Sequence, residues 1–274
     1  MNDPFSHCEQ LVREADKDRF LATLFAPANR RGALFALYAF NLEIARVREV
    51  IRETMAGEVR LQWWRDALER PGAGEAKAHP VAAALLDTII RFRLPVASLI
   101  ALTEARGFDL YNDPMPTLAA VEAYMQTTSS TLIELAARIL DVNHADIAAA
   151  VRDAGIAYAI AGLLRAFPLH AARGQLYVPL EILERYGAKP EDILAGRPTG
   201  EISAALAEMR RLAETHFDAY HQASIPSAVA TAFLPAALVP LYLKTLARSR
   251  DPFRVADVPQ WRRQWALWRA ARRM

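Results

Sequence analysis

The sequence has only one cysteine, Cys8, among its 274 residues. An internal disulfide and a cysteine-based metal site are therefore both excluded. A large excess of charge of one sign is also missing, because 33 basic residues stand against 31 acidic ones and the formal net charge is +2. No global electrostatic field favours nucleic acid, and we expect no nucleic-acid partner.

Membrane spans and leader sequences are not predicted either. No window of about 18 uninterrupted apolar residues occurs, so a membrane-spanning helix is not expected. Residues 1–20 lack the apolar core of a signal peptide and carry acidic side chains that a transit peptide avoids. Lysine is scarce beside arginine and alanine, which is typical of a GC-rich bacterial genome. We expect a cytoplasmic protein, either in solution or peripheral at the bacterial inner membrane.

Helical periodicity dominates what is present. Apolar residues make up 53% of the chain and charged residues 23%, as in a folded globular protein. Runs of alternating strand-like residues are missing, and no internal repeat or long linker divides the chain. The sequence therefore predicts one all-α domain over residues 1–274 with about ten helices. The predicted helices cover residues 9–24, 29–54, 57–70, 80–92, 95–108, 118–140, 143–167, 180–187, 200–223, 226–248 and 258–272.

Caps and breakers set the predicted boundaries. Asn143 is the predicted cap of one long helix, and Pro168 its predicted end. Gly57 marks a loop, and the Gly- and Pro-rich stretch 71–80 reads as a surface loop. A turn is expected before Pro190.

Two helical stretches, 32–51 and 153–167, are apolar nearly all round and become charged at one end. Helices of this kind are typical of buried central positions. Their charged ends fit a polar mouth on an apolar cavity, and they also fit a pair of core helices whose ends reach water. Periodicity alone favours the second interpretation.

Residues in these stretches resemble a known family, the squalene and phytoene synthases. "FLATLFAPANRRGALFALYAF" (20–40) is similar to the family's opening helices, and "GLLRAFPLHAARGQLYVP" (162–179) is similar to its second aspartate-rich motif. The resemblance implies an all-α isoprenoid-synthase fold around a central cavity. It also implies an activity that joins two prenyl diphosphates head to head.

The family's chemistry depends on carboxylates at set positions. Each of its two Asp-x-x-x-Asp motifs places two acids on one helical face, where they hold Mg²⁺ ions that neutralise the diphosphate leaving group. Of the positions that match these acids, only Glu49 keeps a carboxylate. The positions where the acids are lost carry Ala45, Ala166, Leu169 and His170. We therefore expect no metal and no cofactor, with Mg²⁺ relevant only if the chain is an enzyme after all.

A narrower resemblance fits these departures. A branch of the same superfamily acts in assembly of mitochondrial respiratory complex I and shares short stretches with this chain. They are "FNLEIARV" (40–47), "LQWWRDAL" (61–68) and "LRAFPLH" (164–170). The resemblance implies a non-catalytic protein whose partners are complex I subunits or other assembly factors. The alternatives are a head-to-head prenyltransferase and a protein that binds prenyl diphosphate or lipid phosphate without turnover.

A candidate anion pocket follows from these motifs. Guanidinium groups hold phosphate by bidentate contacts without a metal, so the basic residues could retain an anion. The same residues could instead form an ion-pair network with Glu43, Glu49 and neighbouring acids. The candidate pocket consists of Phe40, Asn41, Arg46, Glu49, Arg165, His170, Arg173 and Tyr177.

Three smaller sequence features each allow two interpretations. His170 is either a general base or a hydrogen-bonded structural residue, and Trp63 and Trp64 either fill the core or stack on a ligand. "TTSS" (127–130) either lines a pocket with hydroxyls or allows close helix packing.

The C-terminal helix, 258–272, is basic and rich in tryptophan. Trp261, Trp265 and Trp268 recur at helical spacing on one face, and arginines occupy the others. This pattern is typical of a helix on an anionic membrane surface. The alternative is that the tryptophans pack back on the bundle.

Overall fold

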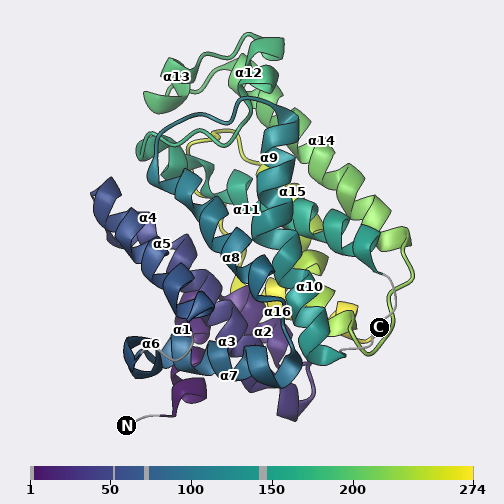
Figure 1. Ribbon diagram of the computed structural model, residues 1–274. Helices are drawn as coiled ribbons and strands as arrows, with labels where there is room; N and C mark the ends of the chain where they lie inside the picture. The colour runs from purple at the N-terminus through teal and green to yellow at the C-terminus, as the bar shows by residue number, and fades with distance from the viewer. Residues whose placement is uncertain (1–2, 52, 71–73, 142–146, 274) are drawn as a thin grey trace.

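The computed structural model describes residues 3–51, 53–70, 74–141 and 147–273, and these ranges contain helices and loops but no strand (Figure 1). The predicted all-α fold is confirmed. It has more elements than the expected ten or so because several predicted helices are broken. The elements are α1 (Pro4–Ala15), α2 (Lys17–Thr23), α3 (Ala28–Ala45), α4 (Val47–Val50), α5 (Thr54–Glu69), α6 (Gly74–Ala78), α7 (Pro80–Phe92), α8 (Val96–Ala105), η1 (Arg106–Leu110), α9 (Leu118–Met125), η2 (Gln126–Ser130), α10 (Thr131–Leu140), α11 (Ala148–Ala172), α12 (Leu180–Tyr186), α13 (Pro190–Leu194), α14 (Gly200–Gln222), η3 (Ala230–Leu238), α15 (Val239–Ala247) and α16 (Gln260–Ala271).

Two helices form the centres of the core, as the sequence predicts. Residues 33–42 of α3 are all buried, and α3 packs against α1, α7 and α10. α11 packs along the length of α14, which borders one side of the molecule (Figure 1). Arg19 of α2 joins the two centres, because its guanidinium lies 5.5 Å from the ring of Tyr38 on α3 and 5.2 Å from the ring of Tyr158 on α11.

Two predicted helices are each divided by one residue. The carboxylate of Asp16 accepts a hydrogen bond from the backbone N–H of Arg19 at 3.0 Å, so Asp16 caps α2 and separates it from α1. Arg46, with φ −98° and ψ 6°, separates α3 from α4. The continuous helices predicted over 9–24 and 29–54 are therefore wrong at these points.

Pro168 does not end α11, contrary to the prediction. Proline cannot donate to the carbonyl four residues before it, so one helical hydrogen bond is lost. The helix still continues to Ala172, because Phe167 and Ala171 are buried in the core and hold the last turn in place. The predicted cap Asn143 lies outside the described residues.

Close packing explains two further differences. Gly57, predicted to mark a loop, lies inside α5, where an added Cβ would be 2.7 Å from Leu110 Cδ2. The predicted helix 118–140 contains the π-helical segment η2, where Ser130 Oγ donates to the carbonyl of Arg152 at 3.0 Å. A Cβ on Gly155 would lie 2.4 Å from Ser130 Cα, so this end of "TTSS" serves close helix packing.

Short or irregular helices account for the remaining differences. The predicted loop 71–80 contains α6. The predicted turn before Pro190 is present at Gly187, and the short helix α13 that follows it was not predicted. The predicted helix 226–248 begins as the 3₁₀ segment η3, which includes Pro235, and becomes α-helical at Val239.

Two helical stretches, Ala148–Ala172 and Ala230–Ala247, are long and apolar enough to cross a membrane by length and composition. About half of the most apolar window in each is buried inside the bundle, 50% and 56% respectively. Buried core helices pass the same test, and both stretches occupy such positions here.

Candidate functional site

The two motif-bearing segments meet at Arg46, Glu49 and Arg173, which together are called the mouth below. The break at Arg46 places Glu49 on the short helix α4, and Arg173 follows directly after α11. Glu49 Oε1 lies 3.0 Å from Arg173 Nη1, and its Oε2 lies 3.1 Å from Arg46 Nε. The one carboxylate retained from the family motifs is therefore held between two guanidinium groups.

These contacts change the acidity of Glu49. Burial acts to raise the pKa of its carboxyl group, but hydrogen bonds and charge from Arg173 and Arg46 outweigh burial and lower it. Glu49 is therefore ionised at neutral pH. Its negative charge offsets part of the positive charge of Arg46 and Arg173, which the sequence analysis gave as candidates for binding an anion.

A buried network lies beneath this mouth and is centred on Asp109 of η1. Its Oδ1 accepts hydrogen bonds from the hydroxyls of Tyr124 and Tyr177, each at 2.6 Å, and its Oδ2 lies 3.2 Å from Arg106 Nη1. Arg106 also reaches Asn41 Oδ1 at 3.5 Å. Burial, together with the Asp109 charge, raises the pKa values of both tyrosines well above the ordinary range. Tyr177 and Asn41 thus belong to a packed polar network.

His170 lies next to this network, with its ring centroid 4.6 Å from that of Tyr177. Burial lowers its pKa to about 4, although the Asp109 carboxylate acts in the opposite direction. The imidazole is therefore neutral at neutral pH and is a weak base. It adds no positive charge to the mouth.

Arg165 is not brought together with Arg46 and Arg173 in the contacts of the described residues. Its guanidinium lies 3.9 Å from the ring centroid of Tyr242, and its Nη1 is 3.8 Å from Asp18 Oδ2. Asp18 also pairs with Arg263 of α16 at 3.0 Å and accepts a hydrogen bond from Tyr242. The candidate residues therefore divide between a mouth and a separate cluster around Asp18.

Phe40 is a core residue. It is fully buried, and its ring lies edge-on to Trp64 at 5.1 Å. Trp64 is fully buried and Trp63 partly so, with Arg60 4.9 Å from the Trp63 ring. Both tryptophans fill space between helices. Arg60 in turn pairs with Glu43 at 2.9 Å, so Glu43, a predicted partner of the candidate basic residues, is engaged by an arginine outside that set.

The residues at the lost acid positions do not fit a Mg²⁺ cluster. Ala45 and Ala166 have no ligand atoms in their side chains, Leu169 is apolar and exposed, and His170 is a nitrogen base where Mg²⁺ prefers oxygen. Glu49 is already engaged by two cations. Within the described part of the chain, no three His, Cys, Asp or Glu side chains converge as a metal site would require.

Two cavities of very different volume lie near the mouth. The cavity that His170 and Tyr177 line holds only about 10 Å³. An open groove of about 490 Å³ lies beside α1, and Arg46 and Glu49 form one edge of it. The acidic Glu14 lines the same groove, which reduces its attraction for anions.

Several residues of this site were not predicted from the sequence. No motif marks Arg106, Asp109 or Tyr124, and Gln175 lies within the quoted stretch 162–179 but was not chosen as a site residue. Gln175 Nε2 donates to the carbonyl of Asp109 at 2.9 Å, and this bond connects the motif after α11 to η1. The available signal was an Arg-x-x-Asp pair in "RGFDL" (106–110), a spacing that lets the two side chains pair.

Known proteins share both the sequence pattern and this architecture. The family model for squalene/phytoene synthase matches residues 12–269. An assembly factor 6 of NADH dehydrogenase (ubiquinone) complex I from Rattus norvegicus is 30% identical over 251 residues, 90% of this chain and 74% of that protein. A 15-cis-phytoene synthase from Synechocystis is 26% identical over 211 residues, 72% of this chain and 61% of that protein.

A solved structure shows the same fold. The crystal structure of a dehydrosqualene synthase in complex with a ligand matches with a TM-score of 0.82 at 18% identity, over 98% of this chain and 96% of that one. On the match over residues 12–269, the chain belongs to the squalene/phytoene synthase family.

Proposed function

We propose that this protein is a non-catalytic member of its family that assists the assembly of respiratory complex I. The observation that carries the proposal is the state of Glu49, whose two oxygens are held by Arg46 and Arg173. A carboxylate engaged in this way is a poor Mg²⁺ ligand, and the four other acid positions carry no carboxylate at all. Similarity to assembly factor 6 over 90% of the chain supports the assembly role.

Deletion of the gene in its native host tests the assembly role. We expect reduced amounts of assembled complex I on native gels and reduced NADH:ubiquinone oxidoreductase activity in membranes. Expression of the wild-type chain should restore both. Normal complex I in the deletion strain would contradict the proposal.

The enzymatic alternative is tested separately with purified protein. Incubation with farnesyl or geranylgeranyl diphosphate and Mg²⁺ should release no pyrophosphate above the level without protein. A family member with both acid motifs serves as the positive control. Release of pyrophosphate together with a head-to-head product would establish a prenyltransferase and remove the non-catalytic assignment.

Binding of a prenyl diphosphate without turnover is a second candidate function, favoured by the groove of about 490 Å³ beside Arg46. Calorimetry without Mg²⁺ tests it, with Arg46→Ala/Arg173→Ala as the matched variant. Binding that this variant abolishes would support a ligand at the mouth. If the wild type and the double variant give equal heats on addition of prenyl diphosphate, Arg46 and Arg173 act only as ion-pair partners of Glu49.

We further propose a peripheral location at the cytoplasmic face of the inner membrane. The exposed tryptophans and arginines of α16 support it, because helices of this composition bind anionic membrane surfaces. In cell fractionation the protein should sediment with membranes and be released by high salt or carbonate. Recovery in the soluble fraction at low salt would contradict this location.

A further inference from the structure

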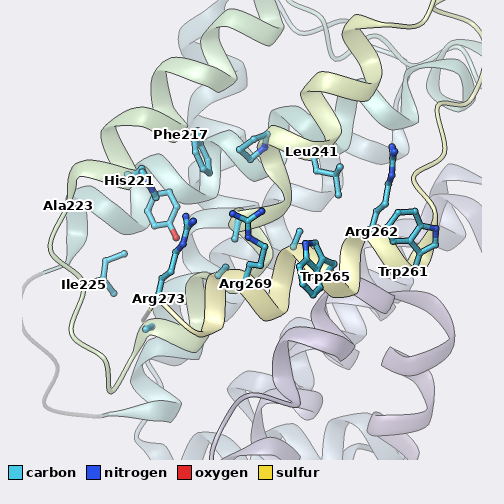
Figure 2. A pocket seen from close by; sticks show the side chains of 16 residues that line it. Phe217, His221, Ala223, Ile225, Leu241, Trp261, Arg262, Trp265, Arg269 and Arg273 are labelled. Carbon is cyan, nitrogen blue, oxygen red and sulfur yellow. The ribbon is translucent and has the colours of Figure 1, made fainter.

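A cavity of about 780 Å³ lies away from the motif-bearing mouth, between the end of α14, η3, α15 and α16 (Figure 2). Its volume is within the range of small-molecule sites in proteins. Aromatic and aliphatic side chains form most of the wall. The apolar lining residues are Phe217, Tyr220, Ala223, Ile225, Ala230, Ala237, Pro240, Leu241, Trp261, Trp265, Ala266 and Ala270.

The charged lining residues are all basic. Arg262, Arg269 and Arg273 come from α16 and the residues that follow it, and none of the described residues that line the cavity is acidic. Figure 2 shows the three guanidinium groups extending from α16 on the same side as Phe217 and Leu241. In the described ranges no carboxylate pairs with any of them, whereas Arg263 on the same helix is paired with Asp18. The cavity thus combines an apolar wall with unneutralised positive charge.

The tryptophans of α16 are exposed beside this cavity. Trp261, Trp265 and Trp268 are 63%, 55% and 40% exposed, so the alternative in which they pack back on the bundle does not hold. Leu267 is the fully buried anchor of the helix. Exposed tryptophan is costly in water and favourable at the interface of a bilayer, where an apolar ring and a polar N–H both find suitable surroundings.

We propose that this cavity binds one anionic phospholipid of the bilayer on which α16 lies. The acyl chain occupies the apolar wall between α14 and α15, and the phosphate is held by Arg262, Arg269 and Arg273. Guanidinium groups hold phosphate by bidentate hydrogen bonds. The proposal deepens the peripheral membrane location above and is independent of the role in complex I assembly.

Vesicle co-sedimentation of the full chain tests the charge requirement. We expect binding to phosphatidylcholine vesicles that contain phosphatidylglycerol and weak binding to phosphatidylcholine alone. Each arginine near an anionic surface strengthens binding about fivefold, so Arg262→Glu/Arg269→Glu/Arg273→Glu should lose more than a hundredfold in affinity. The matched control, Arg91→Glu/Arg248→Glu/Arg250→Glu, makes the same change of charge at exposed positions that do not line the cavity.

A second variant distinguishes lipid binding inside the cavity from attachment of the basic helix to the vesicle surface alone. Ala237→Trp fills the apolar wall and leaves all three arginines in place. After incubation with vesicles, native mass spectrometry should find one phosphatidylglycerol on the wild-type chain and none on Ala237→Trp. Circular dichroism melting curves confirm that each variant is folded.

Two kinds of result would overturn the proposal. Equal binding to neutral and anionic vesicles would remove the phosphate contact. A bound phospholipid on Ala237→Trp, or displacement of the lipid by inorganic phosphate alone, would remove the acyl-chain site.

Discussion

Glu49 and Arg173 lie 124 residues apart in the chain, yet their carboxylate and guanidinium groups are 3.0 Å apart. This contact joins α4 to the end of α11. The family motifs on these two segments supply metal-binding acids. In this chain an ion pair connects the two segments.

Replacing Glu49 by Gln removes this ion pair together with the one to Arg46. Both pairs are partly exposed, so the free energy of unfolding should fall by no more than about 1 kcal/mol at neutral pH. Because the folded-state pKa of Glu49 is lowered, its contribution is present above the unfolded-state pKa of about 4.3 and is lost as pH falls through the folded value. Urea unfolding of wild type and Glu49→Gln should therefore converge in acid.

Glu69→Gln provides the control for that experiment, because Glu69 is exposed and has no ion pair among the described residues. Its unfolding curves should match wild type. A Glu49→Gln difference that persists unchanged in acid would show that the carboxylate charge is not what stabilises the contact.

Replacing Asp109 by Asn should be far more costly. The substitution leaves Arg106 buried without its charge partner and disturbs the hydrogen bonds from two tyrosines. Loss of one partner from a buried pair costs about 3–5 kcal/mol. Urea unfolding should show this loss, whereas Asp113→Asn, at a nearby exposed position, should leave stability nearly unchanged. A loss below about 1 kcal/mol for Asp109→Asn would mean that Arg106 is solvated.

His170 should titrate far below an ordinary histidine. Its pKa is lowered from 6.5 to about 4 by burial, so NMR should show its ring protonating near pH 4. A group with a depressed folded-state pKa binds protons more readily in the unfolded chain. As pH falls from 6.5 towards 4, wild type should therefore lose stability relative to His170→Gln. The same variant assigns the resonance, and a midpoint near 6.5 would refute the buried neutral imidazole.

Two glycines of α11 offer a matched comparison. A Cβ on Gly155 would lie 2.2 Å from Ser130 Oγ and 2.4 Å from Ser130 Cα, whereas nothing lies within 4 Å of a Cβ on Gly162. Gly155→Ala should lower the free energy of unfolding by about 1–3 kcal/mol through overpacking. Gly162→Ala should raise it by up to about 1 kcal/mol, because alanine is the better helix former. Equal effects in thermal unfolding would contradict the close contact between α11 and η2.

Local sequence features predicted much of the fold. Helical periodicity identified the all-α class, the buried helix around residues 33–42 and the ends of α12 and α14 to within a residue or two. It did not predict the break at Asp16 or the continuation through Pro168. In the first a side-chain cap outweighs helix propensity, and in the second burial of Phe167 and Ala171 outweighs a lost hydrogen bond.

The sequence by itself determined that Ala45, Ala166 and Leu169 offer a metal no side-chain ligand atoms, whatever the fold around them. Only the tertiary structure decided where the charges go. It pairs Arg46 and Arg173 with Glu49 and turns Arg165 towards Asp18, and it places Arg262, Arg269 and Arg273 beside an apolar cavity with no ion pair to another described residue. The physical reason is that an ion pair depends on distances of a few ångströms between residues far apart in the chain, and no local pattern encodes them.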